Sequence, residues 1–161
     1  MTRAALYARV STKEQDTTGQ KLRLIEYARM QGWEVFGYYE DHASGKDDSR
    51  PDLDRMMADA GIHKDGRRSR PKFDVILVTK LDRMMRSLVN MESIILELEG
   101  QQVGLIAFDQ GIDTFNEDPS RKMVRRIISA TADWEREMIV SRVKEGVDKA
   151  KRVASGGFLR P

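Results

Sequence analysis

Short apolar runs alternate along this chain with longer stretches in which apolar residues recur at helical spacing. The apolar runs cover residues 4–10, 34–40, 73–79 and 103–108. Nearly continuous apolar runs of this length are typical of parallel strands that are buried on both faces. Strands that alternate with helices predict an α/β fold. We therefore expect a mostly parallel β-sheet of about four to five strands, covered by helices on both faces, with a long C-terminal helix.

Three helices are predicted after the first three strands, at residues 19–30, 51–60 and 84–98. In the first, the apolar positions that recur at helical spacing are Leu22, Ile25, Tyr27, Ala28 and Met30. Gly32 suits the left-handed residue that ends this helix, and Pro51 suits the first turn of the second. Asp41 should end the second strand, so residues 42–49 are expected to form a polar loop.

The last helical pattern is unusually long and runs from about Ser120 to Ala154. Its apolar positions include Met123, Ile127, Ala130, Trp134, Met138 and Val147. A helix of about 35 residues would span about 50 Å at 1.5 Å per residue. That length exceeds the width of so small a domain, so part of the helix must contact a partner or lie along a ligand. We divide the chain into an α/β core at residues 1–118, the long helix at 119–154 and a linker at 155–161.

The composition fits one globular domain and restricts its chemistry. The chain has 161 residues, of which 40% are hydrophobic and 34% are charged, which suffices for a single packed core. It contains no cysteine, so disulfides, cysteine-ligated zinc and thiol catalysis are excluded. No stretch reaches the roughly 18–20 apolar residues of a membrane span, so we expect a cytoplasmic protein without membrane contact. The net charge of +2 is too small to indicate a nucleic-acid partner by itself.

Reactive or charged residues follow each predicted strand at its carboxyl end. In chain order they are Arg9, Ser11, Asp41, Asp82, Arg83, Arg86 and Asp109. Parallel strands place their carboxyl ends along one edge of the sheet, where α/β proteins bind their ligands. We therefore expect these side chains to meet at one site.

Ser11 has two interpretations. Residues 11–14, Ser-Thr-Lys-Glu, fit a capping box in which the serine and the glutamate satisfy the first amides of a helix. Alternatively, Ser11 is a nucleophile, because Arg9 lies two residues before it on an extended backbone and further arginines should reach the same edge. Asp82 likewise has a second interpretation, as the cap of the helix that follows the third strand.

Arg83 and Arg86 would open the helix after the third strand, where the helix dipole disfavours cations. A bound anion would relieve this conflict. With Arg9 and Arg50 nearby, the natural anion is a phosphate held by forked guanidinium groups. This arrangement permits attack of a serine hydroxyl on a phosphodiester without a metal ion.

A magnesium pocket and a histidine base are the competing hypotheses for this edge. Asp41, Asp82 and Asp109 could together hold magnesium, but several arginines should occupy the same space. His42 and His63 are far apart in sequence and lie in predicted loops. We therefore interpret each histidine as a surface residue.

Five motifs occur along the chain in the order Tyr7–Thr12, Asp41–Gly45, Arg50-Pro51, Leu81–Arg86 and Asp109–Thr114. Together they resemble the catalytic domain of the serine recombinases, the resolvase and invertase family, over about residues 3 to 152. The combination is far more specific than any single motif.

The resemblance implies the catalytic domain of a site-specific DNA recombinase that needs no metal ion or cofactor. Ser11 would attack a DNA phosphate, form a 5′-phosphoserine link and release a 3′-hydroxyl. Strand exchange and religation would follow. The active-site positions that match the family are Ser11, Arg9, Arg50, Arg83, Arg86, Asp82, Asp41 and Gln20.

The resemblance also implies a role for the long helix. It would pack homodimers and tetramers and then lead basic residues across double-stranded DNA. The residues assigned to DNA binding are Arg142, Lys144, Lys149, Lys151 and Arg152.

Three features depart from the family pattern. Asp59 stands where small resolvases carry a lysine, so a different electrostatic arrangement is expected there. The basic segment 61–72 is longer than in compact members, and we favour a solvated loop over an added DNA contact. The chain stops at Pro161, where the family continues into a DNA-binding domain, so we expect a catalytic-domain fragment or a natural truncation.

The alternative function is a non-catalytic dimerisation or regulatory module on the same fold. The intact Ser11 and its arginines argue against this alternative.

Overall fold

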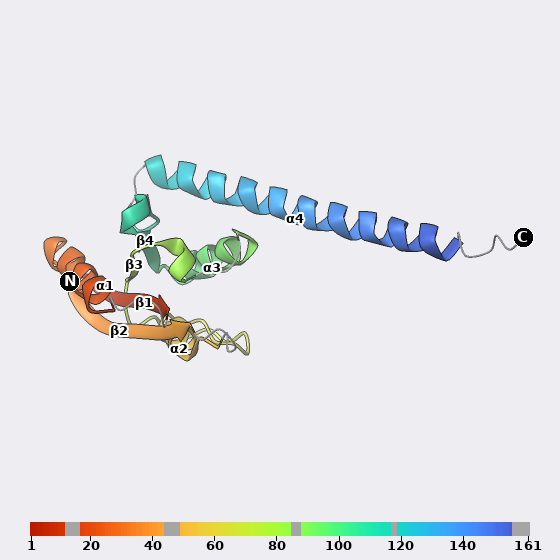
Figure 1. Cartoon of the computed structure of the whole chain (residues 1–161). Coiled ribbons are helices and arrows are strands. Elements are labelled where there is room, and N and C mark those ends of the chain that lie inside the picture. The colour runs from red at the N-terminus through yellow and green to blue at the C-terminus, as the bar shows by residue number, and fades with distance from the viewer. Residues whose placement is uncertain (12–16, 44–48, 85–87, 117–118, 156–161) are drawn as a thin grey trace, which may run out of the picture.

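The computed structural model describes residues 1–11, 17–43, 49–84, 88–116 and 119–155 (Figure 1). In chain order the elements are β1 (Arg3–Ser11), α1 (Thr17–Met30), β2 (Glu34–Ala43), α2 (Pro51–Asp59), β3 (Val75–Val78), the short 3-10 helix η1 (Leu81–Arg83), α3 (Leu88–Gly100), β4 (Gly104–Ala107), the short 3-10 helix η2 (Phe108–Gln110), β5 (Ile112–Asp113) and α4 (Pro119–Ser155).

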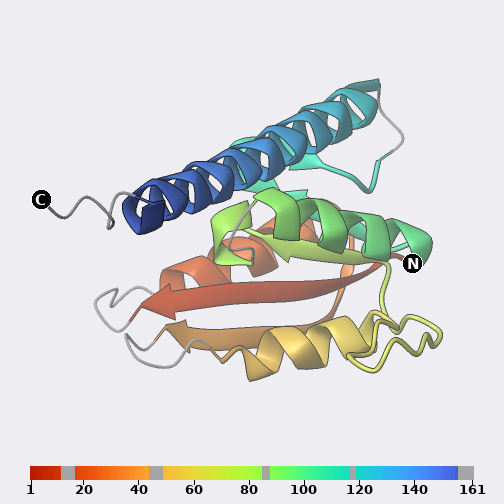
Figure 2. The same ribbon diagram turned by 90° about the vertical axis from the view of Figure 1, so that its right-hand side faces the viewer.

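These elements form a five-stranded sheet with the strand order β2-β1-β3-β4-β5. The first four strands are parallel, and β5 pairs antiparallel with β4 at one edge. Helix α1 covers one face of the sheet, α2 and α3 cover the other, and α4 lies over α3 (Figure 2). The predicted α/β fold, with its mostly parallel sheet and long C-terminal helix, is confirmed.

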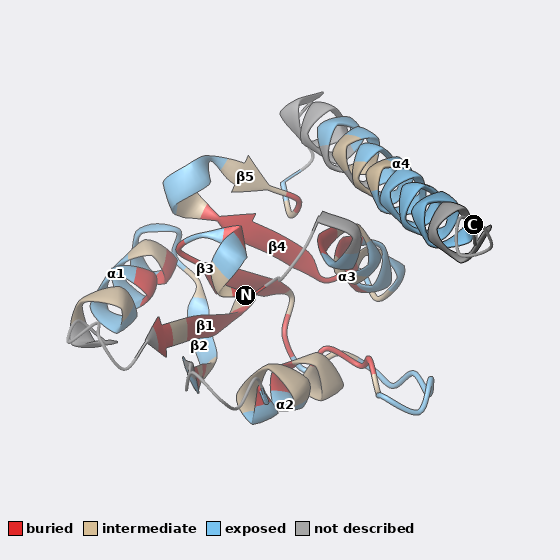
Figure 3. Cartoon of the chain, turned by 45° about the vertical axis from the view of Figure 1, so that its right-hand side comes forward, coloured by how far each residue is buried: buried red, intermediate tan, exposed pale blue. Residues whose placement is uncertain are grey.

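Alternate residues of the central strands pack into two separate cores. Tyr7, Ile76 and Leu105 face α2 and α3, whereas Leu6 and Leu77 face α1. All four residues of β3 are buried, and the central strands are the most deeply covered part of the chain (Figure 3). Each large apolar side chain that is fully buried contributes roughly 1.5–3 kcal/mol. The buried central strands therefore hold the residues at the carboxyl edge of the sheet in fixed positions.

The buried face of α1 agrees only in part with the predicted one, since Ala28 and Tyr27 pack in the core as predicted but the other three positions do not. Leu24 and Ala28, one turn apart, are fully buried against the sheet, whereas Leu22 is 60% and Met30 is 77% exposed. Ile25 is also exposed. The periodicity was misleading because this helix carries apolar residues on two faces, and the small Ala28 lets its own face approach the sheet closely.

Two helix ends agree with their predicted residues. Gly32 has a φ angle of 68°, and the amide of Trp33 donates to the carbonyl of Ala28 at 2.9 Å, which closes the end of α1. Pro51 occupies the first turn of α2.

Two other boundaries are displaced from their predicted positions. β2 continues beyond Asp41, so Asp41 and His42 lie inside the strand and not at its end or in a loop. The third strand is followed by η1, and the described part of α3 covers Leu88–Gly100. Arg83 therefore lies in η1, ahead of α3, while Arg86 falls outside the described residues.

The basic segment 61–72 folds back beside α2, and most of its cations form ion pairs with acidic side chains of the described residues. The closest ion pairs of this segment are Lys64–Asp54 at 2.6 Å, Arg67–Asp65 at 2.6 Å and Lys72–Asp59 at 2.7 Å. Its first residue, Gly61, is buried with a φ angle of 83°, where a side chain would collide with the backbone carbonyl of Ser69. These contacts favour a structural role for the segment over an added DNA contact.

Helix α4 has 37 residues, close to the predicted length, and spans about 55 Å at 1.5 Å per residue. It packs on α3, where Glu92 accepts a hydrogen bond from Arg136. Much of its apolar surface faces outward, and the residues at least 46% exposed are Ile127, Trp134, Ile139, Val140, Val143 and Val147. Among the described helices, none combines the length and apolar composition needed to cross a membrane.

Candidate active site

The end of β1 brings two predicted residues to the face of the sheet that α2 covers. Tyr7 packs into the core beneath α2, and Arg9 follows two residues later on the same face. Arg9 lies opposite Asp41 in the β1–β2 register, and Ser11 lies opposite Ala43. The backbone thus places Ser11 at the last register position of β1, beyond Arg9.

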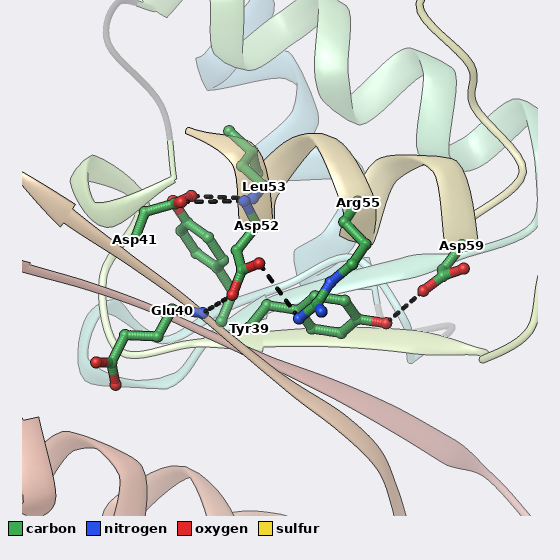
Figure 4. A network of polar contacts seen from close by, with 8 residues as sticks. Tyr39, Glu40, Asp41, Asp52, Leu53, Arg55 and Asp59 are labelled. Atoms are coloured by element: carbon green, nitrogen blue, oxygen red, sulfur yellow. Dashed lines mark hydrogen bonds and ion pairs between the residues drawn. The ribbon is translucent and has the colours of Figure 1, made fainter. Parts of the chain in front are cut away.

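Asp41 is buried at the N-terminus of α2, where three donors share its carboxylate. Its Oδ1 accepts the amide of Asp52 at 3.0 Å, and its Oδ2 accepts the amide of Leu53 at 2.9 Å (Figure 4). The same Oδ2 accepts the hydroxyl of Tyr7 at 3.0 Å. Asp41 therefore supplies the acceptors that the first turn of α2 lacks, and its charge favours the positive end of the helix dipole.

Burial raises the pKa of the Tyr7 hydroxyl, and the neighbouring charge of Asp41 raises it further. The cations of Arg50 and Arg9 act in the opposite direction on the same hydroxyl. Arg9 lies opposite Asp41 in the strand register, and Asp41 accepts a hydrogen bond from the first turn of the helix that Arg50 precedes.

Arg50 is the residue that immediately precedes α2, and it is only 8% exposed. Its Nη1 donates to the backbone carbonyl of Met84 at 2.7 Å. Because Met84 directly follows η1, this bond joins the start of α2 to the turn that contains Asp82 and Arg83. A hollow of about 440 Å³ adjoins Arg50 and Met84 between α2 and α3.

The loops after β3 and β4 are tied together at the same edge of the sheet. The side-chain oxygen of Gln110 accepts the amide of Leu81 at 2.7 Å, and the amide of Asp109 donates to the carbonyl of Thr79 at 3.1 Å. Within η1, Asp82 is exposed. The convergence of strand ends is therefore observed for the backbone.

The helix-dipole argument for a phosphate does not apply to Arg83, because η1 and not the first turn of α3 contains it. For the same reason Asp82 does not cap α3. Ser11 is the last residue of β1, and residues 12–14 of the predicted capping box lie outside the described residues. The capping-box interpretation of Ser11 therefore stays a prediction.

Asp109 does not join the group around Asp41. Both of its oxygens accept the guanidinium of Arg23 from α1, and that guanidinium lies 5.3 Å from the centre of the Phe108 ring. Asp41 faces α2 and Asp109 is bound to α1, so the two do not form one magnesium pocket. Among the described residues, no group of three acidic or histidine side chains could hold a metal ion.

The remaining predicted residues have separate surroundings. The side-chain oxygen of Gln20 is buried and lacks a hydrogen-bond partner within the described part of the chain. His42 pairs with Glu40 at 3.1 Å, and His63 contacts the hydroxyl of Ser69 at 2.9 Å. Both contacts agree with the interpretation of the histidines as surface residues.

The residues of α4 assigned to DNA binding are exposed wherever their side chains are described. They are Arg142, Lys144, Lys149 and Lys151, and the side chain of Arg152 lies outside the described residues.

Sequence reasoning missed two parts of this group. Tyr7 was not assigned a role, although its place two residues before Arg9 puts it on the same face and a buried hydroxyl requires a partner. The second part is the backbone carbonyl of Met84, which accepts a hydrogen bond from Arg50. No residue type in the sequence signals this contact.

Comparison with known proteins agrees with this geometry. The family "Resolvase, N terminal domain" matches residues 4–155. A DNA-invertase of Enterobacteria phage P7 is 33% identical over 155 residues, which cover 96% of this chain and 74% of the relative. The transposon Tn3 resolvase of Escherichia coli is 37% identical over 147 residues, which cover 90% and 70%. A resolvase family site-specific recombinase from Streptococcus pneumoniae has a similar structure, with a TM-score of 0.76 and 31% identity over 94% of this chain and 99% of that one.

Proposed function

The chain belongs to the resolvase N-terminal domain family and is the catalytic domain of a site-specific serine recombinase, and on this premise we propose that Ser11 is the nucleophile that cleaves DNA. The observation that carries the proposal is the pairing of the two strand ends. Ser11 ends β1 directly beyond Arg9, and Arg9 lies opposite Asp41, which holds α2 and with it Arg50 at the same edge.

The proposed step is a transfer of one phosphodiester bond from DNA to the protein. The Ser11 oxygen forms a bond to phosphorus and gives up its proton, while the bond from phosphorus to the 3′-oxygen breaks and that oxygen gains a proton. A 5′-phosphoserine link and a free 3′-hydroxyl result. Because the phosphoester bond is kept, the reverse reaction rejoins a strand without a further energy source.

Arg9 and Arg50 are proposed to stabilise the negative charge that grows on the phosphate oxygens. Guanidinium groups suit this task because they donate paired hydrogen bonds and keep their charge at all physiological pH values. Loss of one such preorganised donor typically costs about 3–4 kcal/mol of transition-state stabilisation. Metal ions are not required in this scheme, since the arginines supply the charge.

Asp41 and Tyr7 are proposed as positioning residues that act through α2. They fix the first turn of the helix, and Arg50 directly precedes that turn. Arg83 and Arg86 are proposed as further phosphate ligands, and Asp82 and Gln20 as supporting residues. These four assignments rest on the match to the family motifs.

The outward apolar residues of α4 support assembly into homodimers, and we extend this to a tetramer in the active complex with double-stranded DNA. An exposed row of Val140, Val143 and Val147 on one face of the long helix is costly in water unless a second helix covers it. The basic residues Lys144 and Lys149 lie further along the same helix, where DNA phosphates would attract them.

The test is a covalent trapping assay with a protein that carries this domain and its DNA-binding region. On a nicked substrate that contains its recombination site, we expect a protein–DNA adduct that survives denaturant and forms in the presence of EDTA. Ser11→Ala should abolish the adduct while DNA binding persists. An adduct that persists in Ser11→Ala would exclude Ser11 as the nucleophile, and failure of the parent protein to form any adduct would support the non-catalytic alternative.

A further inference from the structure

Side-chain contacts attach α2 to β2 at both ends of the helix. The contacts at the C-terminal end involve residues that have no role in the proposed cleavage step. At the C-terminal end of α2, Asp59 Oδ2 accepts the hydroxyl of Tyr39 at 2.8 Å (Figure 4). Asp59 Oδ1 lies 2.7 Å from Lys72 Nζ. Tyr39 comes from β2 and Lys72 from the end of segment 61–72. This pair of contacts therefore joins three parts of the chain.

Contacts between the two ends hold the middle of the helix as well. The guanidinium of Arg55 lies 5.0 Å from the centre of the Tyr39 ring and 3.3 Å from Asp52 Oδ1. The other oxygen of Asp52 accepts the backbone amide of Glu40 at 3.0 Å. Side chains from one turn after another of α2 thus contact β2, and the helix can neither slide nor rotate on the strand without breaking them.

Segment 61–72 completes the fastening at the C-terminal end. The amide of Lys72 donates to the backbone carbonyl of Asp59 at 2.9 Å, and the ammonium group of Lys72 lies at the negative end of the helix dipole. Ile62, at the start of the segment, is buried in the same core as Met56 of α2. Both ends of the segment are therefore attached to α2 or to the core beneath it.

The pKa shifts of Asp59 and Tyr39 agree with the hydrogen bond between them. Burial alone would raise the pKa of Asp59, but hydrogen bonds from Lys72 and Tyr39 outweigh it and lower that pKa. Burial and the adjacent Asp59 together raise the pKa of Tyr39. The carboxylate and the neutral phenol are thus the forms that the fold selects.

We propose that Tyr39, Asp59 and Lys72 are positioning residues for DNA cleavage, which act through α2 on Arg50. This inference rests on the proposed role of Arg50 at the phosphate. A short helix moves as one body, and Asp59 lies about 14 Å from Arg50 at 1.5 Å per residue. Release of the C-terminal end lets the helix tilt, and a displacement of about 1 Å at a reacting group can lower a rate about 100-fold.

The experiment measures single-turnover cleavage by the DNA-binding protein that carries this domain, with four single variants. Tyr39→Phe removes the hydroxyl, Asp59→Asn removes the carboxylate charge, and Lys72→Met removes the ammonium group. We expect cleavage to slow about tenfold in the first two and about threefold in the third, where Tyr39 still holds Asp59. Arg67→Met is the matched control, because it removes a cation of the same segment that pairs only locally with Asp65, and it should leave the rate unchanged.

A background of Arg50→Lys separates positioning from general loss of structure. If Asp59 acts through Arg50, Asp59→Asn should slow the Arg50→Lys protein less than about twofold, because residues that act as a unit are not additive. A full tenfold loss in that background would show an independent effect and overturn the inference. Equal rates in Tyr39→Phe and the parent would also overturn it. If instead Arg50→Lys cleaves as fast as the parent, the proposed role of Arg50 fails first.

Discussion

Replacement of Asp41 by asparagine should destabilise the domain more than any other single loss of charge on or beside α2. The substitution keeps the size of the side chain but leaves one oxygen where there were two, and its amide nitrogen would face a backbone N–H or the hydroxyl of Tyr7. One buried donor therefore loses its acceptor, and the first turn of α2 loses a negative charge.

The magnitude follows from the three donors that Asp41 serves. Loss of a side-chain cap at a helix N-terminus costs about 1 kcal/mol. Loss of a charge that favours the helix dipole costs about 1 kcal/mol in a partly buried position. A disturbed hydrogen bond from a buried hydroxyl adds about 1 kcal/mol. Because these effects overlap, we expect a total of about 2–3 kcal/mol.

Urea unfolding followed by circular dichroism measures this loss. The midpoint should fall with little change in the slope, which would show that stability changed and not the surface exposed on unfolding. For a domain of this size, about 2–3 kcal/mol corresponds to a fall in melting temperature of about 4–12 °C. Asp54→Asn is the matched control on the same helix, because its partner Lys64 is largely exposed and the pair should contribute less than about 1 kcal/mol. If Asp41→Asn were as mild as Asp54→Asn, the assignment of Asp41 as the anchor of α2 would be wrong.

Three further predictions address other parts of the chain. Val143→Glu should weaken self-association at least tenfold in analytical ultracentrifugation, because it places a charge in the outward apolar row of α4; an unchanged association would exclude that row as the interface. Leu24→Ala should cost about 2–5 kcal/mol in urea unfolding and Leu22→Ala less than about 0.5 kcal/mol, and similar costs would contradict the observed rotation of α1. The pKa of Asp59 is lowered in the folded protein, so its stabilising effect is complete above the unfolded value of about 4 and is lost as the pH falls through the folded one. The stability difference between the parent and Asp59→Asn should therefore shrink between about pH 5 and pH 3, and a constant difference would contradict the role of its charge.

The sequence was sufficient for the layout of the sheet, because buried parallel strands have a strong signature. The run at 75–78 is apolar throughout, and all of it is buried. The convergence of polar residues at the carboxyl edge followed from the parallel arrangement alone. This is why Arg9 and Asp41 could be grouped before any contact was known.

Partners and helix rotation could not be predicted, because they depend on contacts between distant residues. Asp109 follows β4 as expected, yet its side chain pairs with Arg23 on α1, 86 residues away in sequence. The inward face of α1 is decided by the fit of Ala28 against the sheet and not by the number of apolar residues on that face. The presence of η1 after β3 similarly removed Arg83 from a helix terminus that the pattern had assigned to it.

The role of Asp41 shows how the structure changes the meaning of a motif residue. From its place beside Arg9, Asp41 invites an assignment to proton transfer or metal binding. In the structure its oxygens accept hydrogen bonds from two backbone amides and a phenol, all neutral donors. Its negative charge therefore stabilises the positive end of the helix dipole of α2. Its effect on the chemistry is indirect, because Arg50 directly precedes the first turn of α2 and is positioned by it. We therefore expect activity to depend on the contacts of Asp59 at the far end of α2 as well as on those of Asp41 at the near end.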